Sequence, residues 1–340
     1  MIYRSKAPLR IGLAGGGTDV SPFCDWYGGA IVNATISLYA HASLEVLAEP
    51  KISLVAHDRN EAAEFELQKE LSLNGHLDLL KGVCNCIQKD YGSITTGFRL
   101  TTYVDAPAGS GLGTSSTLVV AILGAFAEML QLPLGEYDLA QYAFHVERRY
   151  LQWVGGRQDQ YAATFGGVNF MEFYADDKVI VNPLRLRMEA LLELESKILL
   201  YYTETHRQSE AIIREQANNV QKQEKEPVEA MHQLKQQAQM MKQALLKEEL
   251  DALGEILDWG FMQKQKMAKG ITNPFLDEVY ATAKKAGATG GKISGAGGGG
   301  FMLFYCPGTT KYSVMESLRK FGGHHRPYQF VDRGLTTWRM

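Results

Sequence analysis

The sequence is poor in cysteine, and this shortage excludes two kinds of protein. Only 4 cysteines occur among 340 residues, too few for the disulfide framework of a small secreted domain. Cys84 and Cys86 form a C-x-C pair, but no second cysteine or histidine pair stands at ligand spacing, which argues against a zinc site. The cysteine content therefore favours a protein of the reducing cytoplasm.

Long apolar runs and a large net charge are also missing. The longest apolar run, residues 118–127, is about half as long as a membrane-spanning helix requires, so no membrane span is expected. Arg4 and Lys6 precede a glycine-interrupted stretch, unlike the continuous apolar core of a signal peptide. The net charge of −3 provides no general attraction for nucleic acid or anionic membranes, so any anion site must be local.

Glycine, in contrast, is abundant and unevenly distributed. The chain has 34 glycines in 340 residues, which exceeds the usual share of about 7%. They gather at 12–17, 109–113, 155–167 and 287–300. Such clusters indicate backbone that lies close to a ligand or adopts conformations that a Cβ atom forbids.

The apolar patterns predict both strands and helices, with a domain boundary near 180–190. Strands are expected at 31–48, 97–104, 168–174, 198–203 and 301–306, and helices at 71–91, 115–130, 135–150 and 273–286. The polar tract 209–269, interrupted by Pro227, predicts at least two long helices with a solvated face. The composition changes after Pro183, so we place an N-terminal domain at 1–185 and a C-terminal domain at 186–340.

A segment rich in glycine and hydroxyl groups joins the strand 97–104 to the apolar helix 115–130. It consists of Pro107, Ala108, Gly109, Ser110, Gly111, Leu112, Gly113, Thr114, Ser115 and Ser116. The alternating glycines let the backbone turn and present its N–H groups, and the positive end of the following helix favours an anion. The segment therefore predicts a phosphate-binding loop, and a serine-capped strand-to-helix connection is the simpler alternative.

Two other nucleotide-binding motifs do not fit this chain. The P-loop motif requires a lysine in the loop, and no lysine lies between Gly109 and Thr117. The dinucleotide fingerprint G-x-G-x-x-G is matched at Gly295, Gly297 and Gly300, but it should follow a strand and open a helix. Here it precedes the predicted strand 301–306, so a dehydrogenase is not expected.

One hydroxyl side chain at the end of the loop and two carboxylates beyond it suit phosphoryl transfer. Ser115 and Glu147 can supply the one or two protein oxygens that Mg²⁺ usually takes, although Glu147 could instead be a surface residue paired with Arg148 or Arg149. Asp159 can receive the acceptor's proton, and we expect Arg157 to keep its carboxylate ionised. A turn cap is the alternative role for Asp159.

The N-terminal segment supplies further candidates. Arg10 is a second cation for the reaction, and Asp19, beside a glycine cluster, is suited to accept hydrogen bonds from sugar hydroxyls. Gly17, Thr18, Asp19 and Arg157 are expected beside the substrate.

Three motifs in this order resemble those of the GHMP kinases, the superfamily of galactokinase, homoserine, mevalonate and phosphomevalonate kinases. The motifs run from Ala7 to Asp19, from Pro107 to Ser116 and from Lys292 to Gly300. The resemblance implies an N-terminal α+β domain, a ferredoxin-like C-terminal domain and a cleft between them for ATP and substrate. It further implies that Asp159 is the catalytic aspartate, that Arg10 lies near it, and that Ser115 and Glu147 hold Mg²⁺. The glycines of 295–300, among them Gly297 and Gly298, would close the cleft beside the substrate.

Within the superfamily, the chain resembles the sugar 1-kinases that act on heptose 7-phosphates and the related fucokinase domains. Gly16 and Gly17 stand where galactokinases and mevalonate kinases carry a glutamate–histidine pair, which leaves room for a larger or phosphorylated sugar. The expected reaction is ATP- and Mg²⁺-dependent phosphorylation of the anomeric hydroxyl of D-glycero-D-manno-heptose 7-phosphate. An L-fucokinase, a galactokinase-like enzyme and a silent nucleotide sensor are alternatives.

A phosphorylated substrate needs cations at the far end of its pocket. Arg207, Arg214 and Lys292 are candidates, with solvated surface charges as the alternative interpretation. A homodimer is compatible with the sequence, which does not indicate the oligomeric state.

Overall fold

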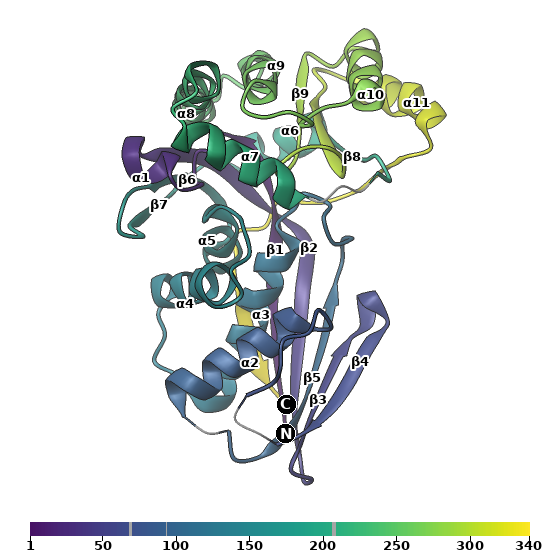
Figure 1. The fold of residues 1–340 in the computed structure, drawn as a ribbon. Helices are drawn as coiled ribbons and strands as arrows, with labels where there is room; N and C mark the ends of the chain where they lie inside the picture. The colour runs from purple at the N-terminus through teal and green to yellow at the C-terminus, as the bar shows by residue number, and fades with distance from the viewer. Residues whose placement is uncertain (68–69, 93, 206–208) are drawn as a thin grey trace.

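The computed structural model describes residues 1–67, 70–92, 94–205 and 209–340, which are built around two sheets (Figure 1). The first sheet has eight strands and the second has four. Strands of the first sheet are β1 (Ile2–Ala14), β2 (Gly29–Leu47), β3 (Lys51–Ala56), β4 (Glu61–Glu66), β5 (Gly97–Val104), β6 (Val168–Phe173), β7 (Val179–Pro183) and β12 (Thr336–Arg339). Their order is β12-β1-β2-β5-β3-β4, with β6 pairing with β2 and β7.

Helices of the first part gather on one side of the long strands (Figure 1). They are α1 (Phe23–Tyr27), α2 (Asp78–Tyr91), α3 (Thr114–Leu130), α4 (Glu136–Phe144), the π-helical segment η2 (His145–Tyr150) and α5 (Gln158–Phe165); a 3-10 turn, η1 (His57–Arg59), follows β3. Helix α3 is apolar around its circumference because it contacts β1 and β2 on one side and α2, α4 and α5 on others. It therefore fixes where the preceding glycine loop must lie.

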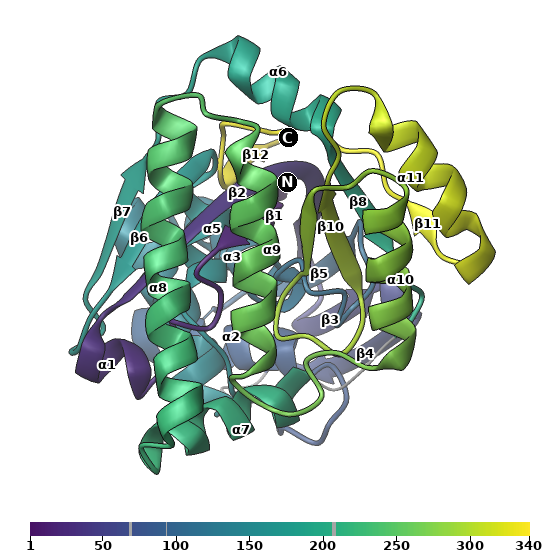
Figure 2. The same ribbon diagram turned by 90° about the horizontal axis from the view of Figure 1, so that it is seen from above.

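The second sheet is antiparallel, in the order β11-β8-β10-β9, and α-helices cover it (Figure 2). Its strands are β8 (Ile198–Tyr202), β9 (Gly290–Ile293), β10 (Phe301–Tyr305) and β11 (His324–His325). The accompanying helices are α6 (Met188–Lys197), α7 (Ser209–Gln221), α8 (Lys225–Leu246), α9 (Ala252–Gln265), α10 (Pro274–Lys285), α11 (Thr310–Leu318) and the 3-10 turn η3 (Arg319–Phe321).

Most predicted elements are confirmed, and the differences have local causes. Helix α2 begins only at Asp78, because Leu77 adopts a left-handed conformation with φ of 55°. The predicted helix 135–150 is α-helical to Phe144 and then widens into a π-helix. Pro227 lies in the first turn of α8, where its missing N–H would have no helical partner.

The predicted α+β fold in two parts is confirmed, with one difference at the chain's end. Strand β7 ends at Pro183 and α6 begins at Met188, so the predicted boundary at 185 falls between the two sheets. Strand β12, however, pairs antiparallel with β1, so the last residues return to the first sheet and the termini lie side by side (Figure 1). Within the described residues, no helix is both long and apolar enough to cross a bilayer.

Candidate active site

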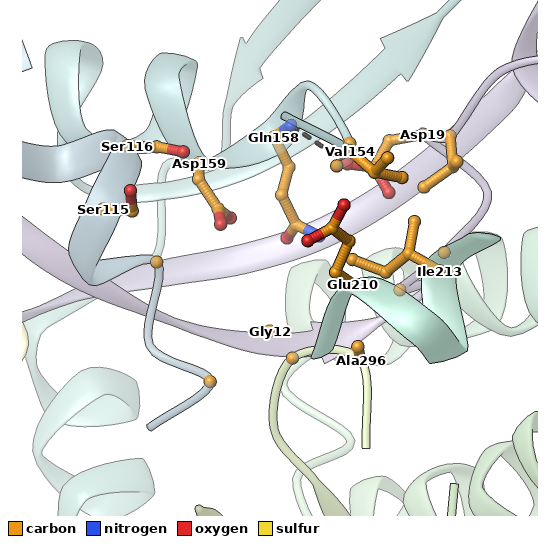
Figure 3. Close-up of a pocket in the computed structure, with 18 of the residues that line it drawn as sticks. Gly12, Asp19, Ser115, Ser116, Val154, Gln158, Asp159, Glu210, Ile213 and Ala296 are labelled. Carbon is orange, nitrogen blue, oxygen red and sulfur yellow. Dashed lines mark hydrogen bonds between the residues drawn. The ribbon is translucent and has the colours of Figure 1, made fainter. Parts of the chain in front are cut away.

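A cavity of about 350 Å³ lies where the glycine loop and β1 meet residues of the second part. Of the predicted site residues it collects Arg10, Gly17, Asp19, Gly109, Gly111, Gly113, Thr114, Ser115, Ser116, Glu147 and Asp159. Figure 3 shows Asp159 and Gln158 pointing into this space from α5, with Ser115 and Ser116 at one end and Glu210 of α7 at the other. The three sequence motifs therefore meet in one place.

The glycine loop is held by its carbonyl groups. Leu112 O accepts from the Arg10 N–H at 3.2 Å, Ser110 O from the Phe301 N–H at 3.0 Å, and Gly111 O from Ser294 Oγ at 2.8 Å. Helix α3 follows at Thr114 with Gly113 as its N-cap, and no side chain caps it. The alternative of a serine-capped connection is therefore wrong, and the N–H groups of the first turn remain available to an anion.

Asp159 is held by Arg10, which lies on β1. Its Nε and Nη2 atoms each lie 2.7 Å from Asp159 Oδ1, and its Nη1 donates to Gly111 O at 2.6 Å. Arg10 is 4% exposed, whereas 21% of the Asp159 side chain is accessible from the cavity side. A buried guanidinium thus fixes a carboxylate that keeps one face open to a ligand.

Arg157 does not play the part expected of it. Its guanidinium turns away from Asp159, bonding Tyr174 O at 2.7 Å and pairing with Asp25 at 2.9 Å and Asp177 at 3.2 Å. Arg157 lines a neighbouring cavity of about 610 Å³ instead. The expected support of Asp159 by Arg157 is therefore wrong, and Arg10 supplies it, because β1 passes directly beside the start of α5.

Asp19 positions α5 from the opposite side. Its Oδ2 accepts the backbone N–H groups of Arg157 at 2.9 Å and Gln158 at 3.1 Å, so Asp19, and not Asp159, caps this helix start. Burial raises the pKa of Asp19, and the nearby Asp159 adds to the rise, while the backbone N–H groups oppose it. Gly156 makes the approach possible, since a Cβ there would stand 1.9 Å from Asp19 Oδ2.

Glu147 is 1% exposed, which contradicts the alternative of a surface glutamate. Its carboxylate accepts from Gln160 Nε2 at 2.5 Å and lies 3.5 Å from Arg148 Nη1, and Gln160 also donates to Ser116 Oγ at 3.1 Å. The π-helix η2 carries Glu147 to the cavity that Ser115 also lines. A buried carboxylate and a hydroxyl facing one space are hard oxygen ligands, which fit Mg²⁺.

Other predicted residues lie outside this cavity. Pro107 and Ala108 line a separate cavity of about 670 Å³, while Ser110, Leu112 and Thr18 are fully buried. The Thr18 hydroxyl bonds Gly15 O and Ala30 O, each at 2.9 Å, so it fixes the turn rather than facing a ligand. Gly297 and Gly298 pack against Ile271.

Of the three cations proposed for a substrate phosphate, one reaches the cavity. Lys292 lines it, and its Nζ donates to Gly12 O at 2.7 Å. Burial, together with Lys264 and Arg10, holds the Lys292 pKa well below its ordinary value. Arg214 is exposed and paired with Glu210, and Arg207 lies outside the described residues.

Sequence reasoning missed Lys264 and Gln216, which also line the cavity. Both belong to the polar tract predicted to present a solvated face, yet Lys264 is only 3% exposed and Gln216 only 2%. Burial lowers the pKa of Lys264 to about 8, with Asp19 opposing and Arg10 adding to the fall. No spacing rule distinguishes these two residues from their exposed neighbours.

Comparison with known proteins agrees with this geometry. Residues 78–167 match the family model of the GHMP kinases N-terminal domain, and residues 241–324 match that of the C-terminal domain. The chain is 45% identical, over 99% of its own length and 99% of the relative's, to the D-glycero-alpha-D-manno-heptose 7-phosphate kinase of Campylobacter jejuni. The chain belongs to the GHMP kinases. As a kinase of this family, it takes ATP as the phosphoryl donor.

Two further relatives show how far the likeness extends. The crystal structure of a D-glycero-D-manno-heptose 1-phosphate kinase from Bacteroides thetaiotaomicron shares 43% identity with this GHMP kinase, covers 99% of each chain and has a TM-score of 0.84. An L-fucokinase/L-fucose-1-P guanylyltransferase of Bacteroides fragilis is 28% identical over 88% of this GHMP kinase, which spans 34% of that relative. The family assignment made from the three motifs is therefore confirmed.

Proposed function

We propose that this GHMP kinase transfers the γ-phosphoryl group of ATP to the anomeric hydroxyl of D-glycero-D-manno-heptose 7-phosphate. The observation that carries the proposal is the 45% identity, over almost the whole of both chains, to a kinase named for that substrate. The solved relative with 43% identity is likewise named for a heptose phosphate. The cavity contributes a carboxylate, several cations and a glycine loop, which suit this reaction.

Asp159 is the proposed catalytic residue. As the anomeric oxygen forms its bond to the γ-phosphorus, the bond from that phosphorus to the β,γ-bridging oxygen breaks and ADP leaves. Asp159 orients the hydroxyl and accepts its proton, and Arg10, which lies 2.7 Å from the same carboxylate, supports the charge that develops.

The glycine loop and α3 are proposed to hold the phosphates of ATP. Gly109, Gly111, Gly113 and residues of the first turn of α3 line the main cavity, and their backbone N–H groups would donate to those phosphates. Ser115 and Glu147 would hold Mg²⁺ beside them. Bound there, the ion would neutralise charge on the β- and γ-phosphate oxygens.

The nucleoside end of ATP fits the cavity of about 670 Å³ on the other side of the same loop. Pro107 and Ala108 line it, together with Tyr103 and Phe301. An apolar and aromatic wall that adjoins a phosphate loop suits a purine. This placement keeps both predicted loop residues in contact with the nucleotide without requiring them in the main cavity.

Asp19 and the glycines beside it are proposed to bind the sugar. The α5 backbone occupies Asp19 Oδ2, which leaves Oδ1 to accept from sugar hydroxyls. Gly17 lines the main cavity together with Asp19. An indirect role, fixing the loops around the substrate, is proposed for Thr18, Arg157, Gly297 and Gly298.

No observation favours the other functions as strongly. The fucokinase relative is 28% identical and contains much more than a kinase unit, so it supports the shared chemistry and not the same sugar. A silent sensor needs neither a buried Glu147 nor an Asp159 fixed by Arg10, and both are present.

The test is a coupled ADP-release screen with purified protein, ATP, Mg²⁺ and matched phosphorylated and unphosphorylated aldoses. The highest kcat/KM is expected for heptose 7-phosphate, and ³¹P NMR of the product should show a second phosphate on the anomeric carbon. Equal kcat/KM for free fucose would overturn the proposed substrate. Solution mass measurement on the same sample tests the homodimer that we also propose.

A further inference from the structure

Gly16 and Gly17 line the main cavity, and side chains from the second part of the molecule pack close to them. A Cβ placed on Gly16 would stand 3.6 Å from Lys264 Nζ. A Cβ placed on Gly17 would stand 2.6 Å from Met267 Cε, which packs against this glycine, and 3.5 Å from Gln216 Oε1. Helices α9 and α7 thus present an ammonium group and an amide where the N-terminal segment carries no side chain.

Lys264 has more hydrogen-bonding capacity than its described neighbours use. Its Nζ donates to Gly295 O at 2.6 Å, which is one bond for a group with three N–H donors. Asp19 attracts it electrostatically, but two backbone N–H groups already occupy Asp19 Oδ2. A cation that is 3% exposed and so weakly paired is costly to bury, and a bound anion would offset that cost.

Gln216 provides the second and independent sign of a ligand. It is 2% exposed, and within the described residues its Nε2 has no hydrogen-bond partner. A buried amide donor without a partner destabilises the fold, so its persistence beside a cavity suggests that a ligand oxygen completes it. The nearby carboxylate of Glu210, which would repel an anion, is paired with Arg214.

We propose that Lys264 and Gln216 bind the terminal phosphate of the sugar phosphate substrate. This assignment rests on the proposed function, because only a phosphorylated sugar brings such a group. A phosphate has enough acceptor oxygens for the ammonium and for the amide N–H at once. The γ-phosphate of ATP, the other phosphate in the reaction, is expected near the Arg10–Asp159 pair and the start of α3, with Lys292 at Gly12 on that side.

The test compares one heptose with and without its 7-phosphate in wild type, Lys264→Met and Gln216→Leu. The measured quantity is the ratio of the two kcat/KM values. Losing a hydrogen bond to a charged group should lower this ratio about 10- to 100-fold in Lys264→Met. A smaller fall is expected in Gln216→Leu, and the KM for ATP should stay unchanged in both variants.

Two control variants separate binding from folding. Lys266→Met removes an exposed lysine from the C-terminal end of the same helix and should leave the ratio at its wild-type value. Lys264→Gln keeps a donor for Gly295 O without the charge, so it should fold with a near-normal Tm and still lose the preference for the phosphate.

A retained preference in Lys264→Met would overturn the proposal. An equal loss on both sugars with a raised KM for ATP would also overturn it, because Lys264 would then serve the γ-phosphate. Binding of inorganic phosphate to wild type and to Lys264→Met, measured by calorimetry without any sugar, gives a readout that does not depend on the heptose. If wild type ignores heptose 7-phosphate but binds inorganic phosphate, and Lys264→Met loses that binding, the proposed substrate fails and the phosphate site stands.

Discussion

At the residue scale, the site depends on charges buried together. Arg10, Lys264 and Lys292 are each less than about 7% exposed and converge on a cavity that also holds Asp19 and Asp159. Charges interact strongly where water is excluded, so each pKa here depends on its neighbours. The arrangement is suited to anionic substrates, because their arrival adds partners to cations that the protein alone satisfies incompletely.

Replacing Asp159 by Asn tests the proton acceptor directly. The amide keeps the shape and can still accept from Arg10, but it cannot take up a proton. We expect kcat to fall about 10²- to 10⁴-fold with little change in Tm. Steady-state ADP release measures the effect, with Asp332→Asn on the exposed C-terminal segment as the matched control. A variant with wild-type kcat would remove Asp159 from the mechanism.

The low pKa of Lys264 predicts a pH dependence of substrate binding. Burial lowers the pKa of Lys264 to about 8; Asp19 opposes this fall and Arg10 adds to it. Lys292 is a further cation that interacts electrostatically with Lys264. The KM for the sugar phosphate should therefore rise as pH increases above about 8, because the ammonium needed to bind phosphate loses its proton. Lys264→Met should lack this rise, and the KM for ATP, measured in parallel, reports titration elsewhere.

The pH dependence of stability has the opposite direction to that of substrate binding. Between about pH 8 and the ordinary lysine pKa of about 10.4, the unfolded chain binds more protons at Lys264 than the folded one. The contribution of this residue to the free energy of unfolding therefore increases with pH across that window. Urea unfolding of wild type and Lys264→Met over this range would show the difference.

At the scale of elements, the site is made by the starts of two helices. Helix α3 presents an uncapped N-terminus after Gly113, and α5 presents Asp159 in its first turn while Asp19 caps it from outside. Neither arrangement leaves room for larger residues: Gly113 adopts a φ of 78°, and a Cβ on it would stand 3.0 Å from Asp159 Cγ. Glycine is needed there for conformation and for space.

Gly113→Ala and Gly322→Ala separate these two requirements. Both glycines have a φ of 78°, but a Cβ on Gly322 would meet nothing within 4 Å. Each substitution should cost about 1–2 kcal/mol of unfolding free energy from backbone strain. Only Gly113→Ala should also lower kcat/KM, by 10-fold or more, because it displaces the Asp159 carboxylate. Equal activity in the two variants would show that Gly113 serves the backbone alone.

At the scale of the whole molecule, the last strand joins the two ends of the chain. Strand β12 covers the edge of β1, the strand that carries Arg10, and the Thr337 hydroxyl donates to Glu128 at 2.9 Å. Leu335 lies over α3, since a Cβ on Gly124 would stand 2.7 Å from its Cδ1. The chain's end therefore supports β1 and α3, the two elements that position the glycine loop.

Deleting residues 335–340 should destabilise the fold well away from the cavity. Lost packing of Leu335 and lost strand bonds predict a fall of about 2–4 kcal/mol in the free energy of unfolding. An exposed β1 edge should also promote self-association. Urea titration with light scattering measures both, and Arg339→Ala, an exposed side chain on the same strand, is the control. An unchanged urea midpoint would contradict this role of β12.

Much of the architecture was predictable because local patterns of apolar and polar residues indicate it. The apolar helix after the glycine loop, the strand at 301–305 and the helices of the polar tract follow from side-chain periodicity over one or two turns. Pairings at long range were not predictable in this way. Arg10 and Asp159 are 149 residues apart. Local reasoning placed the nearer Arg157 beside that aspartate, and only the resemblance to the GHMP kinases implied that Arg10 lies near it.

The amino-acid sequence by itself determined the family, the glycine loop and the candidate reactive groups, because spacing along the chain encodes glycine turns and helix starts. Only the tertiary structure decided the geometry by which Arg10 fixes Asp159, that Asp19 caps α5 and that Lys264 is buried beside Gly16. These outcomes depend on which surfaces pack together. Burial and charge pairing across distant segments are properties of that packing, and no short stretch of sequence contains them.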